Sequence, residues 1–89
     1  MLVLPVDLTR VQASACLQML VQGLRAEPGS SVVVDASALS QFDSAALAVL
    51  LEFRRESRAL GKRFVIRALP ERLRDLADLY GIAELLPAG

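Results

Sequence analysis

The fold is decided by residues 31–51, which read SVVVDASALSQFDSAALAVLL. Three successive valines bounded by turn residues predict a buried strand over Ser31–Asp35. A loop over Ala36–Phe42 follows the strand. The dipeptide Asp43-Ser44 is a favourable helix start, and the apolar sequence after it predicts a helix that continues to Leu60.

The sequence before this stretch predicts a strand and then a helix. Met1–Val6 reads as a short strand. Thr9 and Gln12 have the spacing of a capping box, in which each side chain reaches a free N–H group of the first helical turn. Pro28-Gly29 ends the helix. Its apolar face consists of residues spaced three or four apart, namely Ala13, Leu17, Leu20 and Leu24.

The sequence after residue 60 repeats the same order. Gly61 is placed to end the preceding helix in the left-handed conformation, and Arg63–Ala68 predicts a third strand. Pro70 suits the first position of a helix, and Gly81 follows as its stop. The apolar tail Ile82–Leu86 is expected to pack back on the core. The inner face of this last helix is predicted to hold Leu73, Leu76, Ala77 and Tyr80.

The predicted order is β-α-β-α-β-α without repeats or linkers, so residues 1–89 are expected to form a single α/β domain. Strands that alternate with helices predict a small parallel or mixed sheet with helices packed on it. Binding sites in such sheets gather at the carboxyl ends of the strands. One such end is the segment Asp35–Ser44.

The composition argues against most catalytic and nucleic-acid-binding functions. The 89 residues include no His, no Trp and one Cys, so triads based on His and zinc sites built from Cys or His are not expected. Ten basic and ten acidic residues cancel, which gives no electrostatic footprint for nucleic acid. The longest apolar run, Ala45–Leu51, is too short for a membrane span, and the first residues lack the pattern of a signal peptide. We expect a soluble cytoplasmic protein without cofactor or metal.

The same run, Ala45–Leu51, would cover every face of two helical turns. A surface helix normally has a polar back, so one interpretation is that another protein covers this face. The other is that Ala45 and Ala48 are merely good helix formers on a surface. Ser44 is similarly open: a phosphate on it would be favoured by the helix dipole, but Asp43 or Ser44 can also be a simple N-cap.

These residues resemble the STAS domain family (sulfate transporter and anti-sigma-factor antagonist). Asp35-Ala36-Ser37 matches a strand that ends in Asp-x-Ser, and Asp43-Ser44-Ala45-Ala46-Leu47 matches the family's helix start. The resemblance covers roughly residues 2 to 87. It implies that Ser44 occupies the position of the family's regulatory phosphoacceptor, with Asp43 as the acidic residue beside it.

The closing stretches Leu69-Pro70-Glu71 and Leu79-Tyr80-Gly81-Ile82 resemble one branch of the family, the small cytoplasmic subunit of the Mla phospholipid ABC transporter. This implies a non-catalytic accessory subunit that binds the transporter's ATPase and supports its assembly and activity in lipid asymmetry. The protein would then lie at the inner membrane through its partner. The expected contact residues are Leu39, Gln41, Asp43, Ser44, Ala45 and Ala48.

Two departures from the family pattern matter. The sigma-regulating branch usually has Ser and Gly after the phosphoacceptor, whereas this chain has Ala45 and Ala46, which favours the transporter branch. The family also usually opens with an additional strand, which is missing or truncated here. The first edge of the sheet is therefore expected to be exposed, covered differently or paired with another chain, for example in a homodimer.

Several alternatives stay open. The chain is also interpreted as an anti-sigma-factor antagonist whose partner is an anti-sigma kinase that phosphorylates Ser44. A less favoured alternative is a phosphoacceptor enzyme that uses Asp35 and Asp43 to hold Mg²⁺. Cys16 is expected to be a buried core thiol rather than a redox group. Five cations lie late in the second helix and just after it, namely Arg54, Arg55, Arg58, Lys62 and Arg63. They could meet an acidic partner, but the favoured interpretation is solvated charge that caps the C-terminal end of the helix.

Overall fold

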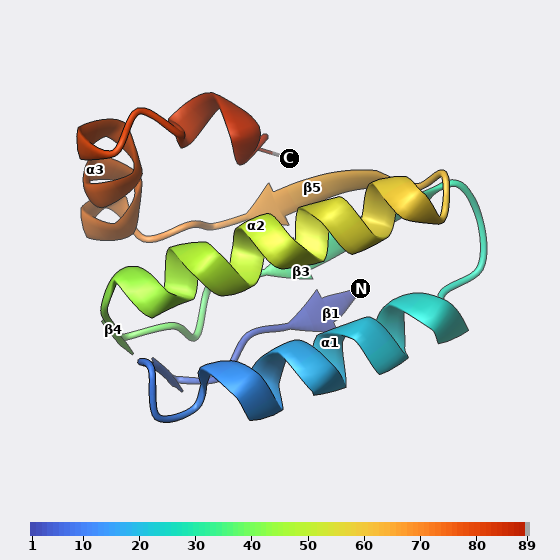
Figure 1. The fold of residues 1–89 in the computed structure, drawn as a ribbon, viewed down its shortest axis with the longest axis horizontal. Coiled ribbons are helices and arrows are strands. Elements are labelled where there is room, and N and C mark those ends of the chain that lie inside the picture. Colours follow the sequence, from blue (N-terminus) through green and yellow to red (C-terminus); the bar gives the residue numbers. More distant parts are fainter. Residues whose placement is uncertain (89) are drawn as a thin grey trace.

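The computed structural model describes residues 1–88 and has α1 and α2 packed on one face of a parallel sheet (Figure 1). The sheet has the order β1-β3-β5, and every strand pairing within residues 1–88 is parallel. The predicted α/β class is confirmed. The elements in chain order are β1 (Leu2–Val3), β2 (Asp7–Leu8), α1 (Ala13–Ala26), β3 (Ser31–Asp35), β4 (Gln41–Phe42), α2 (Ser44–Ala59), β5 (Arg63–Arg67), α3 (Glu71–Leu79) and the short 3₁₀ turn η1 (Ala83–Leu85).

The core lies between the sheet and the two long helices. Alternate residues of β3 and β5 point toward the helices, and Val32, Val34, Phe64 and Ile66 are buried there. Phe53 of α2 is completely buried and meets Phe64 edge to face, with ring centroids 5.3 Å apart. The predicted inner face of α1 agrees with this core, because Leu20 and Leu24 are buried and Ala13 and Leu17 pack partly against it.

Cys16 is also buried among these side chains, as predicted. Burial raises the pKa of its thiol, because the charged thiolate is less stable away from water. A raised pKa lowers the fraction of reactive thiolate at neutral pH. The structure therefore supports a packing role for Cys16.

The predicted strand Met1–Val6 is wrong in its extent, because only Leu2–Val3 is a strand within it, and a second short strand, Asp7–Leu8, follows it. Pro5 has no N–H to donate to a ladder, and the chain bends after it. β1 pairs with β3, whereas β2 pairs with β4 in a separate two-stranded sheet. β4 lies inside the segment Ala36–Phe42, which the sequence predicts to be a loop.

The start of α1 also differs from the prediction. Gln12 Oε1 accepts a hydrogen bond from the Thr9 N–H (2.9 Å), which is one half of the predicted capping box. The other half is absent, since Thr9 Oγ1 accepts from Val11 N–H (3.3 Å) rather than from Gln12. Thr9 to Gln12 form a turn, closed by Gln12 N–H donating to Thr9 O, and the helix begins one residue later.

The chain after β5 packs against the start of α2 and then returns to the sheet. α3 lies crosswise beside the start of α2 (Figure 1), and Arg72 sits 5.4 Å from the centre of the Phe42 ring of β4. The tail packs back as predicted: Leu86 is buried, and the Pro87 carbonyl accepts from Ile66 N–H of β5. Tyr80, predicted on the inner face of α3, is instead 57% exposed, because it lies at the C-cap, beyond the helix.

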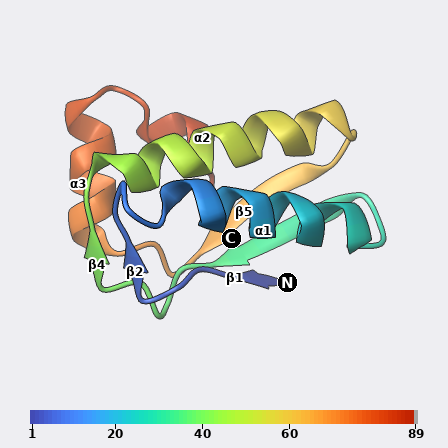
Figure 2. The ribbon, with the colours of Figure 1, turned by 60° about the horizontal axis from the view of Figure 1, so that its bottom comes forward.

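The opposite edge of the sheet is formed by β1, and no strand within residues 1–88 pairs with its outer side. This agrees with the predicted open edge. Val3 is 52% exposed there, and the edge lies beneath α1 (Figure 2). Self-association of two copies through this edge stays a prediction. None of the helices described here combines the length and apolar character that a membrane crossing requires.

Candidate functional site

The start of α2 is capped by Asp43, which decides which of Asp43 and Ser44 is the N-cap. Asp43 has an extended backbone (φ −132°, ψ −167°), and its Oδ1 accepts a hydrogen bond from Ala45 N–H at 2.8 Å. Its second oxygen, Oδ2, accepts from the Arg10 N–H at 3.2 Å. Asp43 is therefore the N-cap of α2 and also ties that helix to the turn before α1.

Ser44 is the first residue of α2, and its side chain is exposed. Asp43 already performs the capping, and no hydrogen bond involves the Ser44 hydroxyl within residues 1–88. The hydroxyl is thus presented to solvent at the positive end of the helix dipole. This position is compatible with a partner contact and with a negatively charged modification.

The small sheet β2-β4 holds this helix start in place. Asp7 pairs with Gln41 and Leu8 with Phe42, and the Val6 carbonyl accepts from the N–H groups of Ser40 and Gln41 (2.8 and 3.0 Å). Figure 2 shows β2 and β4 side by side below the starts of α1 and α2. The two helices consequently begin next to each other, although about 30 residues separate their starts in the sequence.

A shallow apolar groove of about 450 Å³ runs between α1 and α2 from this end. Ala13, Ser14 and Leu17 form the wall on α1. The wall on α2 is formed by Ala45, Ala48, Val49 and Glu52. Ala45 and Ala48 belong to the predicted contact residues. Small side chains on α2 leave room for another protein's side chains to approach the helix closely.

Five of the predicted contact residues are brought together at this end of α2. Gln41, Asp43, Ser44 and Ala48 are exposed, and Ala45 is half-buried. Leu39 does not share this surface, because it is only 6% exposed and packs in the core beneath the loop. It supports the position of the loop rather than offering a contact.

The apolar run Ala45–Leu51 is covered mainly by the molecule itself. Ala46, Leu47, Val49 and Leu50 are buried in the core, and Leu51 is half-buried. The interpretation that a partner must cover all of this run is therefore too broad. Of this run, Ala48, and Ala45 and Leu51 in part, remain for a partner to cover.

Sequence reasoning missed the part of the surface that α1 contributes. Ala13, Ser14 and Leu17 line the groove, and Arg10 stands beside Asp43. The spacing of Ala13 and Leu17 predicted one helix face, but it could not predict that α2 lies beside part of that face. The pairing of β2 with β4, which are far apart in the sequence, brings the starts of α1 and α2 next to each other.

Asp35 and Asp43, the two carboxylates of the phosphoacceptor alternative, each accept a hydrogen bond from a nearby backbone N–H. No group of three or more His, Cys, Asp or Glu side chains in residues 1–88 is close enough to hold an ion. Asp35 Oδ1 instead accepts from the Ser37 N–H (3.0 Å) in a local turn. This bond lowers the pKa of the exposed Asp35 carboxyl, because it stabilises the charged form.

A family model described as "Mlab, STAS domain" matches residues 1–87, which is nearly the whole chain. A comparison with curated proteins found no match.

Proposed function

Because the chain belongs to the STAS domain family of the MlaB type, we propose that it is an accessory subunit that binds the cytoplasmic ATPase of a phospholipid ABC transporter. STAS domains are generally non-catalytic, and we propose the same for this chain. In this role it supports the assembly and activity of the transporter in maintaining lipid asymmetry. Its location at the inner membrane follows from its partner.

The observation that carries this proposal is the exposed helix start beside the apolar groove. The Asp43 side chain caps α2, so the Ser44 hydroxyl is available for contact. Ala48 is exposed one turn further along the same helix and lines the groove. A partner that contacts Ser44 can therefore continue along the groove without displacing any element of the fold.

The exposed start of α2 is also compatible with regulation by phosphorylation of Ser44. A phosphate on Ser44 would add about −1.5 to −2 charges at neutral pH beside an apolar surface, which favours release of a partner. The alanines that follow Ser44 favour constitutive docking over the phosphorylation switch of an anti-sigma-factor antagonist. We therefore keep the transporter ATPase as the proposed partner.

The test is co-purification of the tagged chain with the transporter ATPase from its native cells. We expect Ser44→Glu and Ala48→Arg each to reduce recovery of the ATPase about tenfold or more, which corresponds to roughly 1.4 kcal/mol of binding free energy. The matched controls are Ser30→Glu and Ala59→Arg, which make the same changes at exposed positions away from the start of α2, between α1 and β3 and at the last residue of α2. Circular dichroism establishes that all four variants fold.

Three results would contradict the proposal. One is undiminished recovery of the ATPase with both Ser44→Glu and Ala48→Arg, which would move the interface elsewhere. The second is recovery of a kinase-like anti-sigma factor in place of the ATPase, which would identify the chain as a sigma-regulating antagonist. The third is an equal loss with the control variants, which would remove the evidence for a contact at the start of α2.

A further inference from the structure

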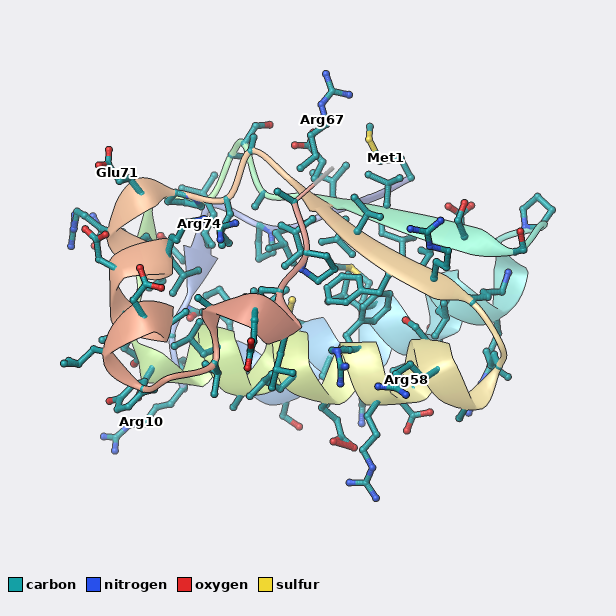
Figure 3. The ribbon with its side chains drawn as sticks, turned by 90° about the horizontal axis from the view of Figure 1, so that it is seen from above. Met1, Arg10, Arg58, Arg67, Glu71 and Arg74 are labelled. Atoms are coloured by element: carbon teal, nitrogen blue, oxygen red, sulfur yellow. The ribbon has the colours of Figure 1, made fainter. Side chains whose placement is uncertain are left out.

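A second hollow lies at the other end of α2, between that helix, β5 and the C-terminal segment. It has a volume of about 480 Å³ and is open to solvent. Among residues 1–88, its lining contains no carboxylate side chain, and its charged members are all cations, namely Arg54, Arg58, Lys62 and Arg63. Figure 3 shows Arg58 on α2, well away from Arg10, which lies beside Asp43 at the start of that helix.

The helix end does not need these cations for capping. Gly61 N–H donates to Arg58 O and Lys62 N–H donates to Ser57 O, both at 2.9 Å, and Gly61 has a positive φ of 71°. This is a Schellman ending, in which backbone N–H groups satisfy the last carbonyls of the helix. The backbone therefore satisfies the last carbonyls of the helix, while the cations still lie where they complement its dipole.

Other interactions engage only one of the four cations. Lys62 Nζ donates to the carbonyls of Glu27 and Gly29, which holds the turn after α1. Arg55 of α2 forms an ion pair with Glu52 at 3.7 Å, but Arg55 does not line the hollow. Within residues 1–88, the guanidinium groups of the other three lining cations make no hydrogen bond or ion pair; they are Arg54, Arg58 and Arg63.

The edge of β5 adds a backbone donor to this lining. Arg63 N–H donates to Ser30 on the β3 side, whereas Ile66 N–H donates to Pro87 on the outer side. Since the direction of the N–H groups alternates along a strand, the Phe64 N–H also points to the outer edge, where Phe64 lines the hollow. Val65 and Pro87 supply apolar surface around this donor.

We propose that this hollow binds a phosphate-bearing ligand. The planar fork of a guanidinium matches the oxygens of a phosphate in a bidentate manner, and several unpaired guanidiniums without a competing carboxylate favour a multiply charged anion. The hollow is larger than inorganic phosphate, and its apolar part suits an organic substituent on the phosphate. The phosphate can belong to a soluble compound or to a lipid headgroup. The site lies at the far end of α2, so the inference is independent of the proposed ATPase contact.

Amide NMR of the labelled chain at 150 mM NaCl tests the soluble arm, with inorganic phosphate and glycerol 3-phosphate as probes. We expect saturable shifts at the amides of residues 58–65, and tighter binding of glycerol 3-phosphate. The variant with both Arg54→Gln and Arg58→Gln should weaken binding about tenfold or more, because two charged partners are lost. Arg55→Gln, which removes one arginine charge from the same helix outside the hollow, should leave binding unchanged.

Vesicle flotation tests the lipid arm, with phosphatidic acid vesicles compared with phosphatidylcholine vesicles. Flotation with phosphatidic acid that the double variant loses and Arg55→Gln keeps identifies a lipid headgroup as the source. Soluble binding without flotation identifies a soluble phosphate compound. The proposal is overturned if neither probe gives saturable shifts and no flotation occurs, or if Arg55→Gln reduces binding as much as the double variant does.

Discussion

Asp43 and Ser44 divide two tasks that the sequence could assign to either residue. Both are favourable at a helix start, and the sequence predicts the start but not the division. Asp43 takes the cap because its carboxylate reaches both the Ala45 N–H and the Arg10 N–H. The second of these bonds joins positions 33 residues apart, so no local pattern could predict it.

Ala68 has a backbone conformation that its side chain disfavours. Its φ is +59°, in the left-handed region, whereas the other residues with positive φ in residues 1–88 are glycines. We expect Ala68→Gly to raise the free energy of unfolding by up to about 1 kcal/mol, since an L side chain costs roughly 1–2 kcal/mol there and glycine's extra freedom when unfolded offsets part of the gain. Urea unfolding followed by circular dichroism measures the change.

The matched control for Ala68→Gly is the reverse change, Gly61→Ala, at a φ of +71° in the ending of α2. A Cβ at Gly61 meets no atom within 4 Å, so its effect arises from backbone strain alone. Gly61→Ala should lower the free energy of unfolding by about 1 kcal/mol. A lower stability for Ala68→Gly would show that the backbone at Ala68 is not left-handed.

At the scale of elements, local pattern predicted the long elements well and the short ones poorly. The strand Ser31–Asp35 agrees with its prediction, and α2 and β5 each end one residue before theirs. β2 and β4 have two residues each, and neither has a periodicity of its own. They are strands because they pair with each other, although they lie far apart in the sequence. This pairing depends on the fold as a whole, so local sequence does not predict it.

The starts of α1 and α2 should depend on Asp43 more than on Ser44. We expect Asp43→Ala to lower the free energy of unfolding by about 1–2 kcal/mol, because it removes the cap of α2 together with the bond to Arg10. Ser44→Ala should change it by less than about 0.5 kcal/mol, since its exposed side chain makes no capping bond. Urea unfolding of both variants decides this, and an equal loss in the two would contradict the assignment of the cap.

At the scale of the whole molecule, the surface is divided into regions of different character. The start of α2 presents small apolar residues around Ser44, and the end of α2 presents unpaired arginines. A third region follows β1 and the outer side of α1 and holds five of the eight exposed large hydrophobic side chains described; they are Met1, Val3, Val6, Val11 and Met19. The sequence predicted the open edge of β1 but not the apolar residues of α1 beside it.

The candidate docking face, which is the exposed start of α2 and the groove beside it, could also be predicted only in part. The residues on α2 could be proposed from sequence, because the helix start matches the family pattern and its apolar run is continuous. The wall that α1 contributes, and the burial of Leu39, depend on how the helices and the loop pack. Single-sequence patterns do not report those contacts, because they join residues far apart along the chain.

The central claim is that the start of α2 contacts the transporter ATPase, and site-specific photo-crosslinking in the native cells tests it most directly. A photoreactive amino acid at Ala48 should crosslink the chain to the ATPase, whereas the same group at exposed Ala59 of α2 should not. Ser44→Glu in the same chain should abolish the crosslink from Ala48. A crosslink from Ala59 but not from Ala48, or a crosslink from Ala48 to a kinase-like anti-sigma factor, would contradict the account.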